Sequence, residues 1–520
     1  MDQLSTVHRR KQMIDSAIGK KYGLLISIGI LLSLLFLRVS SHKYSLDTSV
    51  LLVVLRNIIF DQSTFNPIGG INQFSAHFSP ILILLSPLYF LGPTMLIFIW
   101  KFFCYGAFLL ILWRLIDTEH RHSVTNWHKN LFLILVALHP TFILNAISPD
   151  IWDSDLILPL LGLSVLFVSR DKYFWGVFWL CLTFLVKEDM ILVGILYGIF
   201  LACRAKNVRF IWLSVLCLGW FWITTRYVMP FFSTSGEGLA LLKFSFGNLG
   251  NSLGEIIVNS VINPHLLIES GFWLRKFASL FIIFACVGFL PFLRKSSLIY
   301  LLPGLSVLGY TLIAAQPYLD YSKHYVLAFL VFVVWSSYES YLAIDKDSRS
   351  KLALYSISAS AFLVLVLQIN IRVWSYYFSP IENLRALESV EKEYIPPGSY
   401  LFTAGVGSPW TCYKNHCAIS AELSPAELET KRHDFVLINL RTIFWEGLSC
   451  SDQSLAINLR KLNRNQNYRV LTYTDDIVLL VKNRSGDDSR QPDWSARIGK
   501  YQKINHDCMK WDLMRKVRLL

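Results

Sequence analysis

The chain has few charged residues and none of the common nucleotide-binding motifs. Only 16% of its 520 residues are charged, whereas 54% are hydrophobic and 14% are aromatic. A soluble protein of this length could not bury so much apolar surface, so the bilayer must act as solvent for much of the chain. A P-loop and a G-x-G-x-x-G segment are both absent, so the sequence gives no sign of a nucleotide-binding fold.

The nine cysteines form no C-x-x-C pair and no histidine-spaced metal pattern, so no zinc-type site is expected. In the C-terminal region, Cys412 and Cys417 bracket four residues and would form a local disulfide in an oxidising compartment. Five other cysteines lie in or beside apolar runs, where cysteine behaves as a small hydrophobe: Cys104, Cys181, Cys203, Cys217 and Cys286.

The charge that is present is mainly positive, with a formal net charge of +13. No basic segment with interleaved aromatic residues points to nucleic acid, so nucleic acid is not an expected partner. In a membrane protein, Lys and Arg gather on the cytoplasmic side and near anionic headgroups. The basic N-terminus precedes an apolar run over residues 22–39 without a small-residue cleavage site, which indicates a signal anchor with a cytoplasmic N-terminus.

Hydropathy predicts about eleven transmembrane helices. Residues 80–91 are left out because a helix of that length rises only about 18 Å, against a hydrocarbon core of about 30 Å. Pro87 interrupts this segment as well, so we interpret it as re-entrant or interfacial. With this assignment every turn placed inside is basic, and the C-terminal region is external. The expected spans are 22–39, 94–113, 130–147, 156–169, 173–187, 189–203, 209–227, 272–292, 297–316, 325–343 and 352–371.

The sequence therefore predicts a mainly α, multi-pass protein of the cell (inner) membrane. Residues 1–371 would form the transmembrane domain, with a first external loop over 40–93. In residues 372–484, helical and strand-like runs alternate, which favours a small external α/β domain. Residues 485–520 form a polar tail.

Unusual polar residues gather at the outer ends of the expected spans. Asp61 and Gln62 follow an amphipathic stretch in the first external loop, and His77 comes sixteen positions after Asp61. Charges at span ends are costly unless they face water or partners, so the clustering predicts a polar cavity. The other candidates come from later external segments: Asp150, Asp153, Asp155, Lys187, Glu188, Asp189, Arg226, Lys323 and His324.

Plainer interpretations stay open for several of these residues. Asp61 would also suit the end of an interfacial helix, and Asp153 and Asp155 would also suit a solvated loop. The Lys187–Asp189 segment would also suit a self-neutralising turn. A lone histidine such as His324 is more often a satisfied interfacial side chain than a catalyst.

Several segments together resemble a family of predicted bacterial and archaeal membrane proteins, domain of unknown function 2079. The resemblance covers most of the chain. That family usually shows a His-Pro-acid signature near the outer end of the third span, where this chain has Ser148-Pro149-Asp150. The segments that carry the resemblance are Asn57-Ile-Ile-Phe-Asp-Gln62, His77-Phe-Ser-Pro-Ile81, Pro87-Leu-Tyr89, Lys187-Glu-Asp189 and His324-Tyr325.

The layout is also similar to the GT-C superfamily of glycosyltransferases. That resemblance implies transfer of a sugar from a polyprenyl-phosphate-linked donor to an acceptor at the outer membrane face. It assigns Asp61 as the acidic residue of the first external loop and Asp150, Asp153 or Asp155 as a second acidic site. We add His77 to the catalytic candidates and assign the remaining polar residues to substrate binding. A divalent metal, which some members use, has no identifiable ligand spacing here.

Two other functions remain open from the sequence. A transporter or flippase of lipid-linked substrates would also surround a cavity with charges, but it would normally show internal repeats, and none is visible. A non-catalytic assembly protein would act through its external domain and would tolerate substitution of Asp61. The partners expected for the enzyme are the lipid-linked sugar donor and the surrounding membrane lipids.

Overall fold

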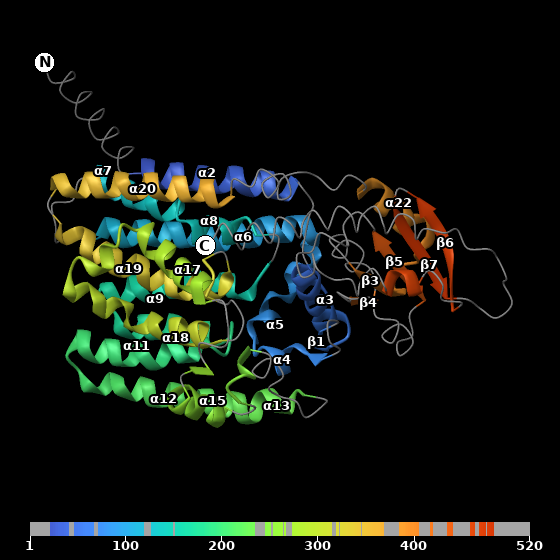
Figure 1. The fold of residues 1–520 in the computed structure, drawn as a ribbon, viewed down its shortest axis with the longest axis horizontal. Coiled ribbons are helices and arrows are strands. Elements are labelled where there is room, and N and C mark those ends of the chain that lie inside the picture. Colours follow the sequence, from blue (N-terminus) through green and yellow to red (C-terminus); the bar gives the residue numbers. More distant parts are fainter. Residues whose placement is uncertain are drawn as a thin grey trace, which may run out of the picture.

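The protein is a bundle of helices with a small sheet at one end, seen in Figure 1. The computed structural model describes residues 21–40, 46–66, 71–118, 126–148, 151–233, 245–250, 253–263, 265–266, 273–314, 319–321, 323–344, 346–368, 384–404, 416–419, 434–439, 458–462, 467–474 and 476–482. The predicted polar tail over 485–520 and the residue Cys412 lie outside these ranges, as does Asp150.

The central helix of the bundle is α19, which is apolar on all sides and has 89% of its residues buried. A helix that is hydrophobic all round belongs in the interior, and α19 packs against α9 and the 3-10 segment η6. The bundle helices are α2 (Tyr22–Ser40), α6 (Gly92–Thr118), α7 (Asn126–Ala137), α8 (Pro140–Ala146), α9 (Ile157–Ser169), α10 (Tyr173–Thr183), α11 (Met190–Ala205), α12 (Ile211–Ile223), α17 (Trp273–Ala285), η6 (Lys295–Gly304), α18 (Leu305–Ile313), α19 (Leu327–Ala343) and α20 (Lys346–Gln368).

The expected count of about eleven spans is not confirmed. Among the described residues, five helical segments are long and apolar enough to cross a membrane, or six if the bent pair α7 and α8 forms one span. Helices do lie where the other spans were expected, but several are short. The helices α9, α10 and α11 have 13, 11 and 16 residues, which gives lengths of about 17–24 Å against a core of about 30 Å.

The bend of 55° between α7 and α8 follows from the local sequence. His139 is the N-cap of α8, and its side chain accepts a hydrogen bond from the backbone N–H of Thr141. Pro140 then occupies the first turn, where its missing N–H costs nothing, although it would break a continuous helix. The chain therefore stops one helix and starts another within the bundle.

The described residues of the first loop, which the sequence predicts to be external, form separate elements at one end of the bundle (Figure 1). The helix α5 and the 3-10 segment η1 have only five and six residues, and Gly92, with a φ of 71°, turns the chain into α6. Residues 81–91 are therefore not one straight helix. The loop elements are α3 (Leu46–Phe60), β1 (Phe65–Asn66), β2 (Ile71–Asn72), α4 (Gln73–Ala76), α5 (Ile81–Leu85) and η1 (Ser86–Leu91).

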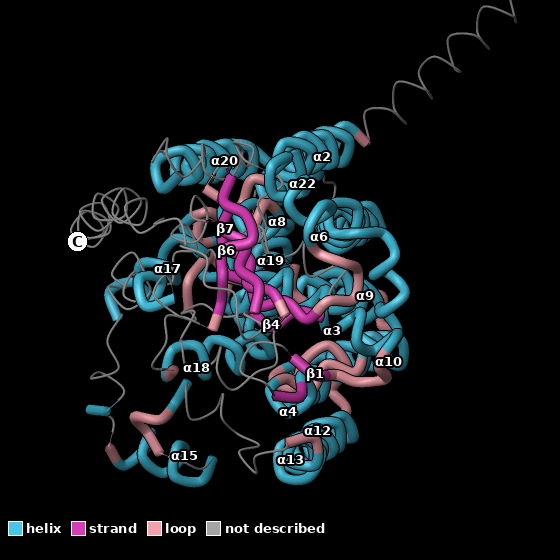
Figure 2. Tube along the Cα trace, turned by 90° about the vertical axis from the view of Figure 1, so that its right-hand side faces the viewer, coloured by secondary structure: helices cyan, strands magenta, loops and turns pink. Residues whose placement is uncertain are grey.

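The expected C-terminal α/β unit contains a five-stranded mixed sheet of order β4-β3-β5-β7-β6. Strand β3 is parallel to β4 and β5, whereas β7 is antiparallel to β5 and β6. Figure 2 looks onto this end, with the sheet in front of the helices. The elements are α22 (Leu384–Tyr394), β3 (Tyr400–Ala404), β4 (His416–Ile419), β5 (Phe435–Asn439), β6 (Tyr468–Thr474) and β7 (Ile477–Lys482).

The sheet is joined to the first external loop by apolar packing. Val53 of α3 belongs to the same buried cluster as Leu387 of α22 and Leu401 of β3. Burying such side chains together stabilises the contact by roughly 1.5–3 kcal/mol for each one fully covered. The C-terminal domain and the first loop therefore lie at the same end of the bundle.

Candidate functional site

Four segments that are distant in sequence meet at the loop-bearing end of the bundle. They are residues 77–79, the 3-10 turn η2 (Asp153–Leu156), the turn between α10 and α11, and η7 (His324–Val326). The N–H of Ile81 donates to the carbonyl of Leu185 at 2.9 Å and ties the first loop to the α10–α11 turn. We call the set His77, Asp153, Lys187, Glu188, Asp189 and His324 the outer cluster.

The closest link in the outer cluster joins His77 to Glu188. The Nδ1 atom of His77 lies 3.1 Å from Oε1 of Glu188, and the backbone N–H of Phe78 donates to Oε2 at 3.0 Å. The His77 side chain is 31% exposed and that of Glu188 is 16% exposed. In the neutral tautomer whose Nδ1–H donates to an ionised Glu188, Nε2 is the acceptor of the ring.

The two adjacent carboxylates of the α10–α11 turn have opposite electrostatic environments. Burial raises the pKa of Glu188, but the attraction of His77 and Lys187 outweighs it and lowers that pKa to about 2. Burial also raises the pKa of Asp189, which Lys187 opposes and Glu188 reinforces, and here the result stays above the ordinary value. Paired carboxyl groups with pKa values pushed apart are typical of sites that move protons.

Lys187 is held within the protein. Its Nζ lies 3.4 Å from Oδ2 of Asp189 and 4.5 Å from the centre of the Tyr325 ring. Tyr310 donates its hydroxyl proton to the same Asp189 oxygen at 2.7 Å. Burial lowers the pKa of Lys187, but Asp189 and its neighbours raise it above the ordinary value, so the side chain is a cation.

Two buried atoms of the outer cluster have no hydrogen-bond partner among the described residues: Oδ1 of Asp189 and Nδ1 of His324. The ring of His324 stacks on Trp152 with 3.8 Å between ring centroids. Leaving a buried polar atom unpaired costs about 1–3 kcal/mol, so such atoms point to a missing partner. A ligand, a water or a proton would satisfy them.

Asp153 and Asp155 have different surroundings despite their short separation. Oδ2 of Asp153 accepts the hydroxyl proton of Ser79 at 2.6 Å, at the edge of the outer cluster. Asp155 is fully buried, 2.8 Å from Nζ of Lys101, and accepts the hydroxyl proton of Tyr105 at 2.8 Å. This ion pair is therefore part of the bundle interior, and a substrate would reach Asp155 only by opening it.

Asp61 and Gln62 directly follow the end of α3 and lie on the surface. The Asp61 side chain is 41% exposed, and its Oδ2 lies 3.2 Å from Nη1 of Arg56. Gln62 is exposed with a left-handed φ of 48°. Among the described residues, no interaction joins Asp61 to the outer cluster.

Arg226 and Lys323 are both exposed and lie on segments close to the outer cluster. Arg226 belongs to the π-helical turn η4 (Thr224–Val228), which leads into α13 (Met229–Phe231). That end packs against α4, where the rings of Phe232 and Phe74 lie 5.4 Å apart. Lys323 directly precedes His324. Both cations are open to solvent, unlike Lys187.

Sequence reasoning missed the side chains that hold the outer cluster together. Tyr310 and Trp152 lie in or beside apolar runs, where aromatic residues are common and give no signal. Tyr325 is part of the His-Tyr motif, and Ser79 of the His-Phe-Ser-Pro motif, so these two could have been found.

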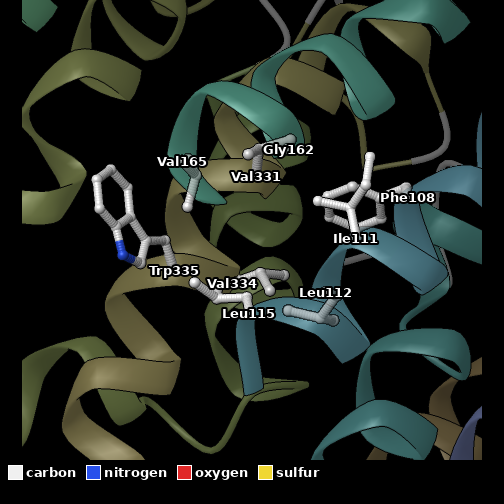
Figure 3. Close-up of a pocket in the computed structure, with 9 residues that line it drawn as sticks. All are labelled: Phe108, Ile111, Leu112, Leu115, Gly162, Val165, Val331, Val334 and Trp335. Atoms are coloured by element: carbon white, nitrogen blue, oxygen red, sulfur yellow. The ribbon is translucent and has the colours of Figure 1, made fainter. Parts of the chain in front are cut away.

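In the part of the chain that the structure describes, one void in the bundle interior is too small for a cofactor, and the acidic groups form no metal site. Figure 3 shows a void between α6, α9 and α19. Its volume is about 10 Å³, room for about one water, and its walls are apolar, with the indole of Trp335 at one side. Within the described ranges, no group of three or more His, Cys, Asp or Glu side chains is placed to hold a metal ion.

Comparison with known families shows the family to which the chain belongs. Residues 45–479 match the profile of a family described as predicted membrane protein (DUF2079). The chain belongs to the DUF2079 family. No curated protein matches it. The DUF2079 match runs from the first external loop through the bundle to the sheet, so it includes the whole outer cluster. It confirms the first resemblance seen in the sequence and leaves the second, to GT-C glycosyltransferases, as a hypothesis.

Proposed function

We propose that this DUF2079 protein is a GT-C-type glycosyltransferase that uses a polyprenyl-phosphate-linked sugar and acts at the outer membrane face. The observation that supports this most is the His77–Glu188 pair, partly exposed at the end of the bundle beside the first loop. A histidine with one ring nitrogen fixed by a carboxylate is suited to act as a general base through the other nitrogen.

In the proposed reaction, the acceptor hydroxyl oxygen attacks the anomeric carbon of the donor sugar. The bond from that carbon to the lipid phosphate oxygen breaks, and its electron pair leaves with the phosphate. The hydroxyl proton passes to Nε2 of His77, and Glu188 stabilises the resulting imidazolium through Nδ1. The leaving phosphate is already an anion, so it needs electrostatic stabilisation more than a proton.

The structure changes which cations we assign to the phosphate. Lys187 is neutralised by Asp189 and covered by Tyr325, so it serves mainly to hold the α10–α11 turn. The exposed Lys323 and Arg226 are the better candidates for phosphate contacts. His324 and Asp153, with their polar atoms at the cluster, are assigned to the sugar.

The elements around the outer cluster provide an apolar surface for a lipid chain. Leu84 of α5 and Phe90 of η1 have 72% and 63% of their surfaces exposed. Exposed apolar side chains on short helices at the end of a bundle suit an interfacial position. In the proposed topology, with basic turns in the cytoplasm, this end faces outward and the donor lipid lies along α5.

Asp61, the acidic residue that the GT-C resemblance assigns, becomes the second candidate for the base, and Asp150 stays a candidate for the second acidic site. Asp61 is 41% exposed and pairs with Arg56 of its own helix, so no second described segment of the fold holds it in place, whereas His77 is held by Glu188. We therefore give His77 the proton transfer.

The test is release of polyprenyl phosphate from a panel of radiolabelled polyprenyl-phosphate sugars by the purified protein with added membrane acceptors. His77→Gln should lower the rate by about 100-fold or more, the usual scale for a general base. His265→Gln is the matched control because His265 is exposed and lies on another segment. A full rate with His77→Gln, or no release from any donor by the wild type, would contradict the proposal.

A transporter of lipid-linked substrates is the second candidate, favoured by the charge of the outer cluster. Asp153, Glu188 and Asp189 outnumber Lys187, so the site would attract a coupling cation. A transporter would move a fluorescent lipid-linked sugar across liposomes without cleaving it. Cleavage without movement would exclude this alternative.

A further inference from the structure

A second polar pocket lies at the opposite end of the bundle from the outer cluster. It occurs between the α9–α10 turn, the end of α11 and η6, with a volume of about 350 Å³. Since α11 starts beside the outer cluster and is 16 residues long, the pocket lies roughly 20 Å away along the helix axis. It is lined by Asp171, Tyr173, Phe200, Arg204, Ile299 and Tyr300.

Arg204 is the cation of this pocket, and aromatic rings hold it in place. Its Nη1 donates to the hydroxyl of Tyr300 at 2.7 Å. The guanidinium carbon lies 5.5 Å from the Tyr300 ring centre and 5.9 Å from that of Trp335. Its buried Nε has no hydrogen-bond partner among the described residues. A fixed guanidinium with a free donor is suited to a phosphate, whose oxygens match its planar fork.

The other charges around the pocket also favour an anion. Asp171 lines the pocket, and its negative charge would repel an anion. Its carboxylate accepts the hydroxyl proton of Tyr173 at 2.9 Å. Its neighbours in the turn, Arg170 and Lys172, are exposed cations. A further exposed cation, Lys206, follows Arg204. Glu339 also acts electrostatically on Arg204, so the lining itself is not positive, and it is the exposed cations of the neighbouring turns that favour an anion.

Apolar side chains beside the pocket point to a lipid as the source of the phosphate. Phe174 and Trp175, which follow Tyr173 in α10, are 75% and 48% exposed, and Val208 after α11 is 77% exposed. Aromatic residues of this kind mark the boundary between headgroups and acyl chains. A polar pocket at this depth, with acyl-facing rings next to it, matches the headgroup and the first carbons of a phospholipid.

We propose that this pocket binds the phosphate headgroup of an anionic phospholipid in the leaflet at the basic end of the bundle. Arg204 contacts the phosphate through its terminal nitrogens Nη1 and Nη2, and the hydroxyls of Tyr173 and Tyr300 lie at its sides. The bound lipid links the ends of α10, α11 and η6. This site is independent of the proposed sugar transfer.

The experiment counts lipids retained by the full-length protein in native mass spectrometry after delipidation and addition of phosphatidylglycerol or phosphatidylcholine. The wild type should retain phosphatidylglycerol preferentially. Arg204→Gln should weaken this retention about tenfold, the loss expected from a charge-assisted hydrogen bond. Arg209→Gln, which removes an exposed cation at the same end, should leave retention unchanged. If Arg204→Gln does not fold, Arg204→Lys keeps the charge without the fork, and it too should weaken retention.

Three results would overturn the proposal. They are equal retention of the two lipids by the wild type, equal retention by the Arg204 and Arg209 variants, and unchanged retention in both Arg204→Lys and Tyr300→Phe. Glycerol 3-phosphate is added as a soluble competitor to separate the two sources of phosphate. Displacement of phosphatidylglycerol at equal concentrations would mean that the pocket takes a free phosphate, contrary to the lipid proposal.

Discussion

Asp61 and His77 lie in the same loop, sixteen positions apart, yet the fold gives them different partners. Asp61 pairs with Arg56 of its own helix and is 41% exposed. His77 contacts Glu188, which lies 111 positions further along the chain. The two carboxylates differ in the same way. Among the described residues, Asp61 contacts only its own helix, whereas the two oxygens of Glu188 contact two groups of the first loop, the His77 ring and the backbone N–H of Phe78.

This difference indicates which of the two side chains is better placed for catalysis. A side chain with a local partner on the surface can move freely, and its ion pair contributes little. A pair that joins two distant segments is held in one geometry by the whole fold, which is what general-base catalysis requires. The comparison favours the outer cluster over Asp61 as the centre of the proposed site.

The largest expected effect concerns His77 and Glu188 as one catalytic unit. His77→Gln and Glu188→Gln should each lower the rate of polyprenyl phosphate release by about 100-fold or more. Because the two act together, the double variant should be no slower than the slower single variant. Multiplicative losses in the double variant would show that the residues act separately, and the comparison with Asp61 would lose its basis.

The next effect concerns stability and Lys187. Lys187→Gln removes one partner of a buried ion pair and leaves Asp189 uncompensated, which should lower the free energy of unfolding by about 3 kcal/mol. Lys323→Gln, an exposed cation of the same end, should change it by less than about 0.5 kcal/mol. Thermal unfolding in detergent measures both. Equal stability of the two variants would mean that the α10–α11 turn does not depend on Lys187.

A third prediction uses the pH dependence of Glu188. Against the effect of burial, His77 and Lys187 lower its pKa from an ordinary 4.5 to about 2 in the folded protein, so the ionised form stabilises the fold at neutral pH. Because the folded value is depressed, this contribution is present above the ordinary value and is lost as the pH falls through the folded one. The stability difference between wild type and Glu188→Gln should therefore shrink between about pH 5 and about pH 2. A difference independent of pH over that range would contradict the assigned charge.

The smallest effect on stability is expected for the pair of Asp61 and Arg56. Asp61→Asn removes the charge that pairs with Arg56 and should change the free energy of unfolding by less than about 1 kcal/mol, as for other ion pairs with a partly exposed partner. Denaturant unfolding gives this value. A much larger loss would show that α3 depends on the pair and that Asp61 has a structural role.

Much of the fold could be predicted from the sequence, because apolar runs and strand-like segments mark their own positions. The runs near Tyr400, Phe435, Tyr468 and Ile477 became strands β3, β5, β6 and β7. Strand β4 was missed because His416–Ile419 is only four residues long and lacks a clear alternation. The number of spans is not confirmed, because several helices at the expected positions, such as α10 with 11 residues, are shorter than a straight membrane crossing needs.

The candidate site was predicted in part. His77, the Lys187–Asp189 segment and His324 stood out as charged or titratable residues at span ends, and the fold brings them together. Their partners could not be predicted, because a tyrosine such as Tyr310 is ordinary in an apolar helix until its hydroxyl meets a carboxylate. Asp155 shows the converse: its sequence context resembles that of Asp153, yet Lys101 of α6 draws it into the interior.

The most direct test of the central claim compares two matched carboxylate-to-amide changes, Glu188→Gln and Asp61→Asn, in polyprenyl phosphate release by the purified protein. Both keep the shape of the side chain and remove its charge. The account predicts a loss of about 100-fold or more for Glu188→Gln and less than about tenfold for Asp61→Asn. A full rate with Glu188→Gln together with a loss of several orders of magnitude with Asp61→Asn would contradict it and return the base to Asp61.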